Sequence, residues 1–174
     1  MPRSKKPRHP HRNKPGRDYT KLRPEDLSWL RDRFSSIELK VELTLPRGEC
    51  TDTDLFMIRD YVNWGITAVA VRTWYTDETR QQVYEMLQAA AIKVVDLQVR
   101  GRKNGMRFVC TADELSAIRK AFDFLGDFMN KSLHECPALT IREWNAMLRC
   151  SANAKLGQPV EIATKDLIAA VKRS

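Results

Sequence analysis

Residues 111–129 read TADELSAIRKAFDFLGDFM, and this stretch decides the fold class. It opens with Thr111 and carries Glu114 three residues later. This is the pattern of a capping box, in which a hydroxyl and a carboxylate each satisfy an unpaired backbone N–H group at a helix start. Apolar residues then recur at steps of three and four, the period of one helical face: Leu115, Ile118, Phe122, Leu125 and Met129. The stretch predicts a long amphipathic helix.

The same start signal appears once more toward the C-terminus. Thr140 and Glu143 match a second capping box, and the helix that they open is expected to end near Gly157. Its apolar residues are Trp144, Met147 and Leu148. A short final helix is expected after Pro159 and Thr164, with an apolar face made of Leu167, Ile168 and Val171.

Upstream of these helices, Pro24 followed by two acidic residues predicts the start of the first helix. Its apolar face runs to Pro46 and comprises Leu27, Leu30, Phe34, Ile37, Val41 and Leu45. Residues 37–45 also alternate between apolar and polar, which is typical of a half-buried strand. Continuity with the preceding turns favours a helix, but the choice between helix and strand stays open for residues 37–45.

Two further helices are expected between Thr51 and a turn at residues 100–107. Thr51 caps the first, whose inner face is Leu55, Ile58 and Val62. Gly65 and the β-branched residues after it leave residues 66–75 open between helix and strand. Thr76 opens the second, with Val83, Leu87, Ala90, Val94 and Leu97 facing inward. Gly101 and Asn104-Gly105 predict the turn, and residues 108–110 a short extended piece.

Together these elements predict an all-α fold, a compact bundle of five or six helices with short connections. We expect two parts: a disordered basic arm, residues 1–23, and a single helical domain, residues 24–174. The arm is rich in Pro, Lys and Arg and has almost no apolar side chain. It therefore buries too little surface to offset the chain entropy that ordering would cost.

The positive charge of the chain is concentrated in that arm. The chain has 30 Lys and Arg against 22 Asp and Glu, a formal net charge of +8. Residues 1–23 hold nine of these basic residues and a single acid, Asp18, so that residues 24–174 contain 21 of each sign and no net charge. A polyanionic partner is therefore expected for the arm and not for the bundle.

Several classes of protein are excluded by composition. No stretch approaches the run of about 18 apolar residues that a membrane helix needs, and the basic N-terminus lacks the apolar region of a secretory signal. Four prolines between residues 2 and 15 would prevent the amphipathic helix of a transit peptide. The four cysteines are widely spaced, as is typical of reduced thiols: Cys50, Cys110, Cys136 and Cys150. We expect a cytoplasmic protein without membrane contact.

His134 and Cys136 are the candidates for catalysis or metal binding, because a thiol and an imidazole can act as nucleophile and base. Neighbours in one loop seldom face each other, and structural zinc sites normally show paired ligands at short spacing. Acidic pairs fall at expected helix starts, where the helix dipole explains them, and no Walker-type phosphate loop is present. The sequence therefore predicts no enzyme, no metal site and no cofactor.

Nucleic acid is the predicted partner of the arm, with DNA and RNA both open. The candidate contacts are Arg3, Lys5, Lys6, Arg8, Arg12, Lys14 and Arg17. Since the arm has no aromatic residue before Tyr19, it is expected to contact phosphates and to bind independently of sequence. A second group of candidate phosphate contacts lies on the expected turn: Arg100, Arg102, Lys103 and Arg107. The alternative interpretation of this group is an ordinary solvated loop.

A protein contact is the other candidate interaction. Trp74 and Tyr75 follow Arg72, and Trp, Tyr and Arg dominate binding hot spots. Packing in the core is the alternative interpretation for Trp74 and Tyr75. Most of the four tryptophans are expected in or beside the core: Trp29, Trp64, Trp74 and Trp144.

Residues 45–148 resemble a loose group of small helical proteins encoded by tailed bacteriophages and prophages of proteobacteria. The similarity rests on Arg47-Gly48 before the helix start at 51–54, Val62-Asn63, the basic turn at 100–105, the helix start at 111–121, and Thr140–Glu143. That group has no established activity. The resemblance therefore implies a helical fold, a phage origin and the cytoplasm of a bacterial host, and it supplies no catalytic residues. The arm and the extension after Arg149 lie outside it.

Two functions follow as hypotheses. The first is a non-enzymatic accessory protein of phage or prophage type, whose arm contacts nucleic acid while the bundle serves as a body or docking surface. The alternative is a host-interaction factor, such as an inhibitor of a bacterial defence or regulatory complex, that acts through the neutral helical surface. The identity of a host or phage protein partner and the oligomeric state stay open.

Overall fold

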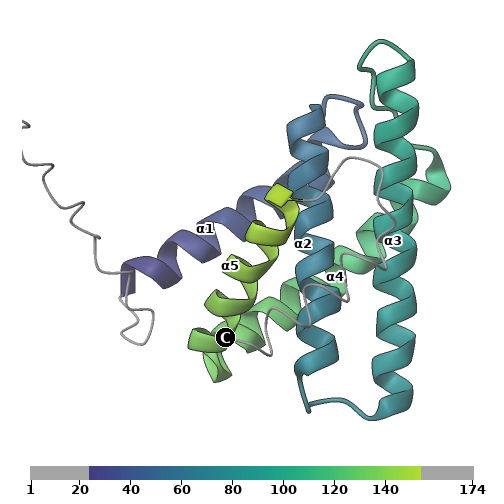
Figure 1. Cartoon of the computed structure of the whole chain (residues 1–174). Coiled ribbons are helices and arrows are strands. Elements are labelled where there is room, and N and C mark those ends of the chain that lie inside the picture. The colour runs from purple at the N-terminus through teal and green to yellow at the C-terminus, as the bar shows by residue number, and fades with distance from the viewer. Residues whose placement is uncertain (1–23, 154–174) are drawn as a thin grey trace, which may run out of the picture.

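The computed structural model describes residues 24–153, which fold into five α-helices and one short π-helix (Figure 1). The helices are α1 (Pro24–Leu39), η1 (Lys40–Thr44), α2 (Asp52–Val71), α3 (Asp77–Lys103), α4 (Ala112–Glu135) and α5 (Pro137–Asn153). No strand occurs within this part of the chain, so the all-α prediction is confirmed. The expected disordered arm at residues 1–23 and the expected final helix after Thr164 lie outside the described residues.

Residues 37–44 are helical, and residues 37–45 do not form a strand. Ile37, Val41 and Leu45 are buried at steps of four, whereas Leu39 and Leu43 are 58% and 51% exposed. A strand would have buried all five on one face, so burial follows the helical period. Residues 40–44 form one π-turn, in which Leu45 N donates to the Lys40 carbonyl five residues earlier at 2.9 Å.

Residues 66–75 divide into helix and irregular connection. α2 continues through Gly65 and the β-branched residues to Val71, and an irregular segment then leads to Thr76, the N-cap of α3. Gly65 fits here because a Cβ atom at this position would lie 2.2 Å from Cδ2 of Leu125. The glycine thus allows α4 to pack closely against α2, and this tertiary contact outweighs its poor helix propensity.

The expectation that Gly101 breaks α3 is wrong, because α3 runs two residues further, to Lys103. Gly101 is buried inside the helix, where a Cβ atom would lie 2.1 Å from Cδ1 of Phe108. The chain reverses instead at Asn104-Gly105, as expected, with positive φ angles at Gly105 and Met106. Residues 108–110 are irregular and pair with no strand in the described chain.

The helix start at Thr111 is confirmed, whereas the one at Thr140 is wrong. Thr111 N donates to Glu114 Oε2 at 2.8 Å, and Glu114 N donates to Thr111 Oγ1 at 3.2 Å, which completes the capping box. α5 begins three residues before Thr140, at Pro137, since proline suits the first helical turn. Thr140 and Glu143 are both fully buried and serve a different network, described below.

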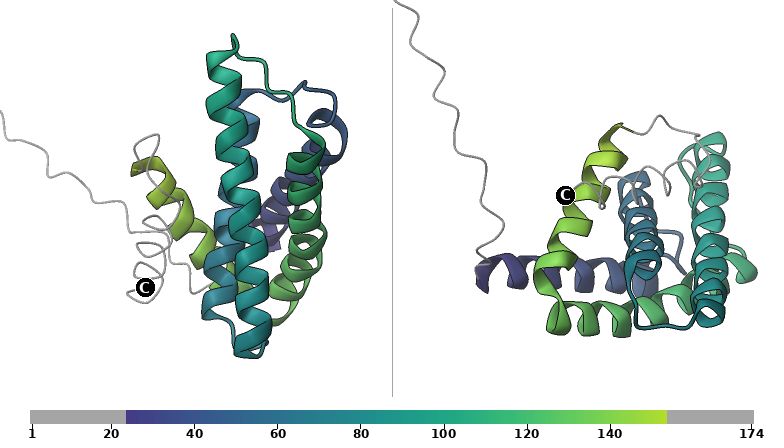
Figure 2. Two further views of the ribbon diagram at one scale, coloured as in Figure 1. Left: turned by 90° about the vertical axis from the view of Figure 1, so that its right-hand side faces the viewer. Right: turned by 60° about the horizontal axis from the view of Figure 1, so that its bottom comes forward.

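The helices are arranged around α2. α2 and α3 run antiparallel and side by side (Figure 1), while α1 and α4 run across them, as the right-hand view of Figure 2 shows. Every residue of α2 from Tyr61 to Val69 is buried. Aromatic rings from four helices meet there, with ring centroids 4.5–5.8 Å apart: Phe34, Tyr61, Trp64, Phe122, Phe128 and Trp144. One hydrophobic core is therefore shared by the described helices.

None of the helices between residues 24 and 153 has the length and apolar character needed to cross a membrane.

Candidate functional site

Two of the four cations predicted at the basic turn are held by carboxylates of the protein itself. Arg100 donates from Nη1 and Nη2 to the two oxygens of Glu114, each at 2.6 Å, and also to the Val109 carbonyl at 2.9 Å. Arg102 donates to the two oxygens of Asp52 at 3.0 and 2.7 Å. Both pairs are bidentate, the strong form of this interaction. Their role here is to tie the end of α3 to the starts of α2 and α4.

The electrostatic consequence is clearest at Glu114. The hydrogen bonds from Arg100 lower the pKa of this carboxyl group from its ordinary value of 4.5 to about 2, against the opposing effect of its burial. The Glu114 side chain is buried, whereas that of Arg100 is 39% exposed. Glu114 therefore stays ionised near neutral pH, and it cancels the charge that Arg100 would otherwise offer to a ligand.

Lys103 and Arg107 complete the predicted group and are exposed. Neither has an ion pair with any described residue. Lys103 borders a shallow depression that it shares with Asp96, Val99, Arg100 and Asn104. The four predicted cations therefore lie near one turn, but only these two leave their charge unpaired within the described chain.

Trp74 and Tyr75 lie half-buried in the connection between α2 and α3. The Trp74 ring packs edge-on against Phe128 at 5.5 Å, and Nζ of Lys131 sits 4.6 Å above its centroid. The ring of Tyr75 is stacked on Phe128 and tilted against Phe124, with centroids 6.2 Å away in each case. Both residues fasten the connection to α4, in line with the core interpretation, and the possible protein contact stays a prediction.

A buried network that the sequence did not reveal joins α2 to α5. Arg72 caps the end of α2 and donates to the two oxygens of Glu143 at 2.5 and 2.9 Å, with side chains 3% and 0% exposed. Arg72 also donates to Thr140 Oγ1 at 3.2 Å. Burial raises the pKa of Glu143 to about 7 even though Arg72 opposes that shift. In the sequence, a capping box explained the spacing of Thr140 and Glu143, so no signal indicated that Arg72 is their partner.

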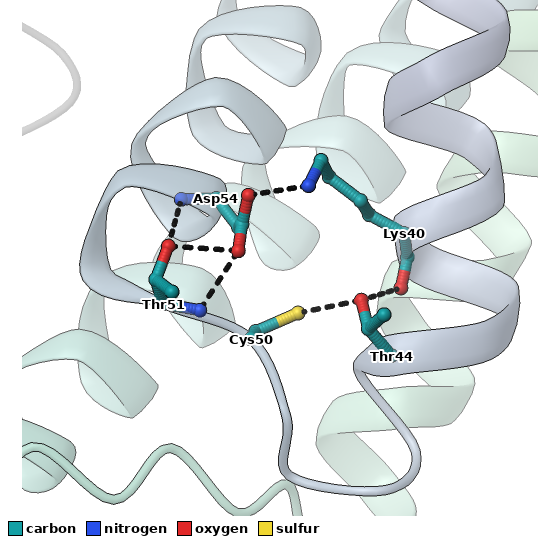
Figure 3. A network of polar contacts seen from close by, with 5 residues as sticks. All are labelled: Lys40, Thr44, Cys50, Thr51 and Asp54. Atoms are coloured by element: carbon teal, nitrogen blue, oxygen red, sulfur yellow. Dashed lines mark hydrogen bonds and ion pairs between the residues drawn. The ribbon is translucent and has the colours of Figure 1, made fainter.

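A second polar network surrounds the π-turn (Figure 3). Lys40 Nζ lies 2.6 Å from Asp54 Oδ1, while Asp54 Oδ2 accepts hydrogen bonds from the backbone N and Oγ1 of Thr51. Sγ of the buried Cys50 lies 3.2 Å from Thr44 Oγ1. Burial raises the pKa of the Cys50 thiol, so it stays protonated and lacks the thiolate of a reactive cysteine. The network fixes the start of α2 and holds no activated nucleophile.

His134 and Cys136 do not form a catalytic pair in the structure. His134 is exposed in the last turn of α4, and not in the connection as expected, and Cys136 follows as the C-cap. Burial raises the pKa of the Cys136 thiol, the opposite of what activates a nucleophile. Among the described side chains, no group of three or more His, Cys, Asp or Glu is arranged to hold a metal ion.

Trp29 lies on the surface and is the exception to the expectation that most of the tryptophans pack in or beside the core. It is 53% exposed on α1, whereas Trp64 and Trp144 are buried. The signal was present in the sequence, because Trp29 falls outside the stripe formed by Leu30, Phe34 and Ile37. A tryptophan away from the apolar stripe of an amphipathic helix faces solvent.

Comparisons with protein-family models, with curated proteins and with solved structures give no match for this chain. The resemblance to phage and prophage proteins therefore remains a prediction.

Proposed function

We propose that the protein is a non-enzymatic accessory protein of phage or prophage type that acts on nucleic acid in the cytoplasm of a bacterial host. Its cationic segment, residues 1–23, makes sequence-independent contacts with phosphates. The helical body holds that segment and presents a neutral surface. Neither a metal ion nor a cofactor is part of this proposal.

The segregation of charge is the observation that carries the proposal. Residues 1–23 have a net charge of +8, whereas residues 24–153 contain 17 basic and 19 acidic residues. Within the body, Arg72, Arg100 and Arg102 are each engaged by a carboxylate. A body that neutralises its own arginines contributes little to binding a polyanion, so phosphate binding falls to the segment that precedes it.

The test is the salt dependence of binding to duplex DNA, measured by fluorescence anisotropy on the full-length protein. If six to eight cations engage phosphates, the slope of log K against log salt is expected to be about −5 to −7. A variant with the seven candidate arm residues replaced by Gln should lose most of this slope: Arg3, Lys5, Lys6, Arg8, Arg12, Lys14 and Arg17. Equal slopes for the two proteins would contradict the proposal.

The matched control is Lys103→Gln with Arg107→Gln, which removes the two unpaired cations of the basic turn. Removing one cation that neutralises a phosphate should change the slope by about 0.9. An unchanged slope in this control would restrict the interface to the arm, and a change near 2 would add the turn to it. If neither variant changes binding, neither the arm nor the basic turn is the interface.

A protein-binding function remains the second candidate, as an inhibitor or regulator of a host complex. It is favoured by the large apolar side chains exposed where α3 leads into α4: Val99, Met106 and Val109. Contiguous exposed apolar surface often marks a protein-binding site. If a stable complex with a host or phage protein survives removal of residues 1–23, this function takes precedence.

A further inference from the structure

The outer face of α3 carries a regular stripe of exposed side chains. α3 packs against α2 and α4 through its opposite face, where Ala90, Val94 and Leu97 are buried. Four exposed residues follow one another at steps of four, three and four, the spacing that keeps side chains in one line along a helix: Ile92, Asp96, Val99 and Lys103. In the left-hand view of Figure 2, α3 lies in front of α2, on the outside of the helical body.

The order of the side chains in this stripe is complementary to itself. From Ile92 onward it runs apolar, acidic, apolar and basic, and the chain then reverses and presents the apolar Met106. Its apolar members are 46–55% exposed: Ile92, Val99 and Met106. Asp96 and Lys103 form no ion pair with a described residue. When the same order is read backwards about Val99, apolar meets apolar and acid meets base.

We propose that the protein forms a homodimer in which the α3 helices of two copies pack antiparallel, with the two-fold axis beside Val99. An interface of this symmetry uses the same patch on both copies, so each unequal contact occurs twice. Asp96 of each copy faces Lys103 of the other, and Ile92 faces Met106 at the turn of the other copy. The two Val99 side chains meet at the axis. This inference goes beyond the proposed function and does not depend on it.

Met106 lacks the contact that usually covers a side chain at its position. Met106 N donates to the Gly101 carbonyl at 2.9 Å, which closes α3 with a Schellman motif. In this motif, an apolar residue two positions after the C-cap normally packs on the residue three or four positions before the cap. Here these residues are Gly101, which has no side chain, and Arg100, whose guanidinium is bound to Glu114. In the dimer, Ile92 of the second copy supplies the missing contact.

A shallow depression marks the centre of the proposed contact. It is lined by Asp96, Val99, Arg100, Lys103 and Asn104. Arg100 lies close to the axis but does not oppose the approach of a second copy, because Glu114 neutralises its charge. Burial of the apolar side chains provides the attraction, while the ion pairs beside them fix the direction and register of the two helices.

The contact is short, so the dimer should be reversible. α3 rises about 16 Å between Ile92 and Lys103. A contact of this length is at the small end of protein interfaces, below roughly 1,200 Å², and the fraction of dimer should therefore depend on protein concentration. Nucleic acid fits this face poorly, because three of its five members are apolar and Asp96 repels phosphate.

Sedimentation equilibrium of the full-length, nuclease-treated protein measures the dissociation constant of the dimer. Asp96→Lys and Lys103→Asp should each raise this constant about tenfold, because each change turns two ion pairs into two like-charge contacts. An equimolar mixture of the two variants should dimerise again, since every charged contact between them joins opposite charges. Asp123→Lys is the matched control, because Asp123 is exposed on α4 and forms no ion pair with a described residue.

Weakening by each single variant together with recovery in the mixture supports the antiparallel register, because a parallel pair would already oppose like charges in the unmodified protein. A protein that stays monomeric at every concentration overturns the proposal, even if a different protein binds this face. A dimer that neither variant weakens also overturns it, as does a loss that the mixture does not restore. None of these outcomes bears on the salt dependence of DNA binding, so this proposal and the proposed function fail separately.

Discussion

At the scale of single residues, Arg72 is the most consequential side chain of the described body. Its guanidinium is buried at the end of α2 and is held by Glu143 and Thr140 of α5. Removing two charges from water costs several kcal/mol per ion, and only their mutual hydrogen bonds offset that cost. Loss of one partner therefore leaves the other group buried without the hydrogen bonds that offset its burial.

We predict that Arg72→Met lowers the free energy of unfolding by about 3–5 kcal/mol, because it leaves the Glu143 carboxyl group buried without its ion-pair and hydrogen-bond partner. The double variant Arg72→Met with Glu143→Met should lose clearly less than the sum of the single changes. Chemical denaturation followed by circular dichroism measures both. Arg31→Met, at an exposed position of α1, is the control and should stay within about 0.5 kcal/mol. A loss from Arg72→Met no larger than that of the control would show that the pair contributes nothing.

At the scale of elements, two arginines in the last turn of α3 connect three helix ends. Arg100 reaches Glu114 in the first turn of α4, and Arg102 reaches Asp52 in the first turn of α2. Each pair joins a cation at a helix C-terminus to a carboxylate at a helix N-terminus. Both charges also suit the dipole of their own helix, so the local and tertiary preferences agree.

The Arg100–Glu114 pair predicts a dependence of stability on pH. The pKa of Glu114 is about 2 in the folded protein, below its ordinary value of 4.5. Its contribution is therefore complete above pH 4.5 and is lost as the pH falls from 4.5 toward 2. We expect Glu114→Gln to cost about 1–2 kcal/mol at pH 7, allowing for solvent screening of the exposed Arg100, and much less at pH 2.

Thermal unfolding at a series of pH values between 2 and 7 measures this difference. Asp113→Asn is the matched control, since Asp113 is an exposed carboxylate in the same first turn and forms no ion pair with a described residue. Parallel stability curves for Glu114→Gln and the unmodified protein, separated by the same amount at every pH, would contradict the expected linkage.

At the scale of the whole molecule, the described helices depend on one core. Rings from α1, α2, α4 and α5 meet around Trp64, and Leu87 of α3 packs close to Gly65 of α2. A helix that detaches from this core leaves a cavity in the packing of its neighbours, which costs several kcal/mol. The body is therefore built to unfold as a unit.

We accordingly predict a single cooperative unfolding transition for residues 24–153 within the full chain. Far-UV circular dichroism reports the helices, and tryptophan fluorescence reports the core, because two of the four tryptophans, Trp64 and Trp144, are buried in it. The two signals should change at the same denaturant concentration, as in two-state domains of this size. Separate midpoints would mean that part of the helical body is stable without the aromatic core.

Structural features that depend on neighbouring residues were predicted correctly from the sequence. Features that depend on tertiary packing were not. The period of Leu115–Met129 and the capping box before it concern neighbouring residues, so they predicted α4 and its start correctly. Gly101 was mistaken for a helix breaker. A glycine is needed at this position because the ring of Phe108 packs against it, and the sequence does not show that contact. Thr140 and Glu143 fitted a capping box equally well, and their partner Arg72 lies 71 residues from Glu143. Long-range pairing of this kind leaves no pattern in a single sequence.

The π-turn at residues 40–44 also bears on how this chain tolerates changes in length. A π-turn contains one residue more than the α-helical repeat requires. Deletion of Leu43, which is exposed, would place Leu45 three positions after Val41 in place of four, and both spacings keep the two side chains on one face of the helix. We therefore expect the π-turn to tolerate the deletion of one residue, because the apolar contacts on either side of it stay in register.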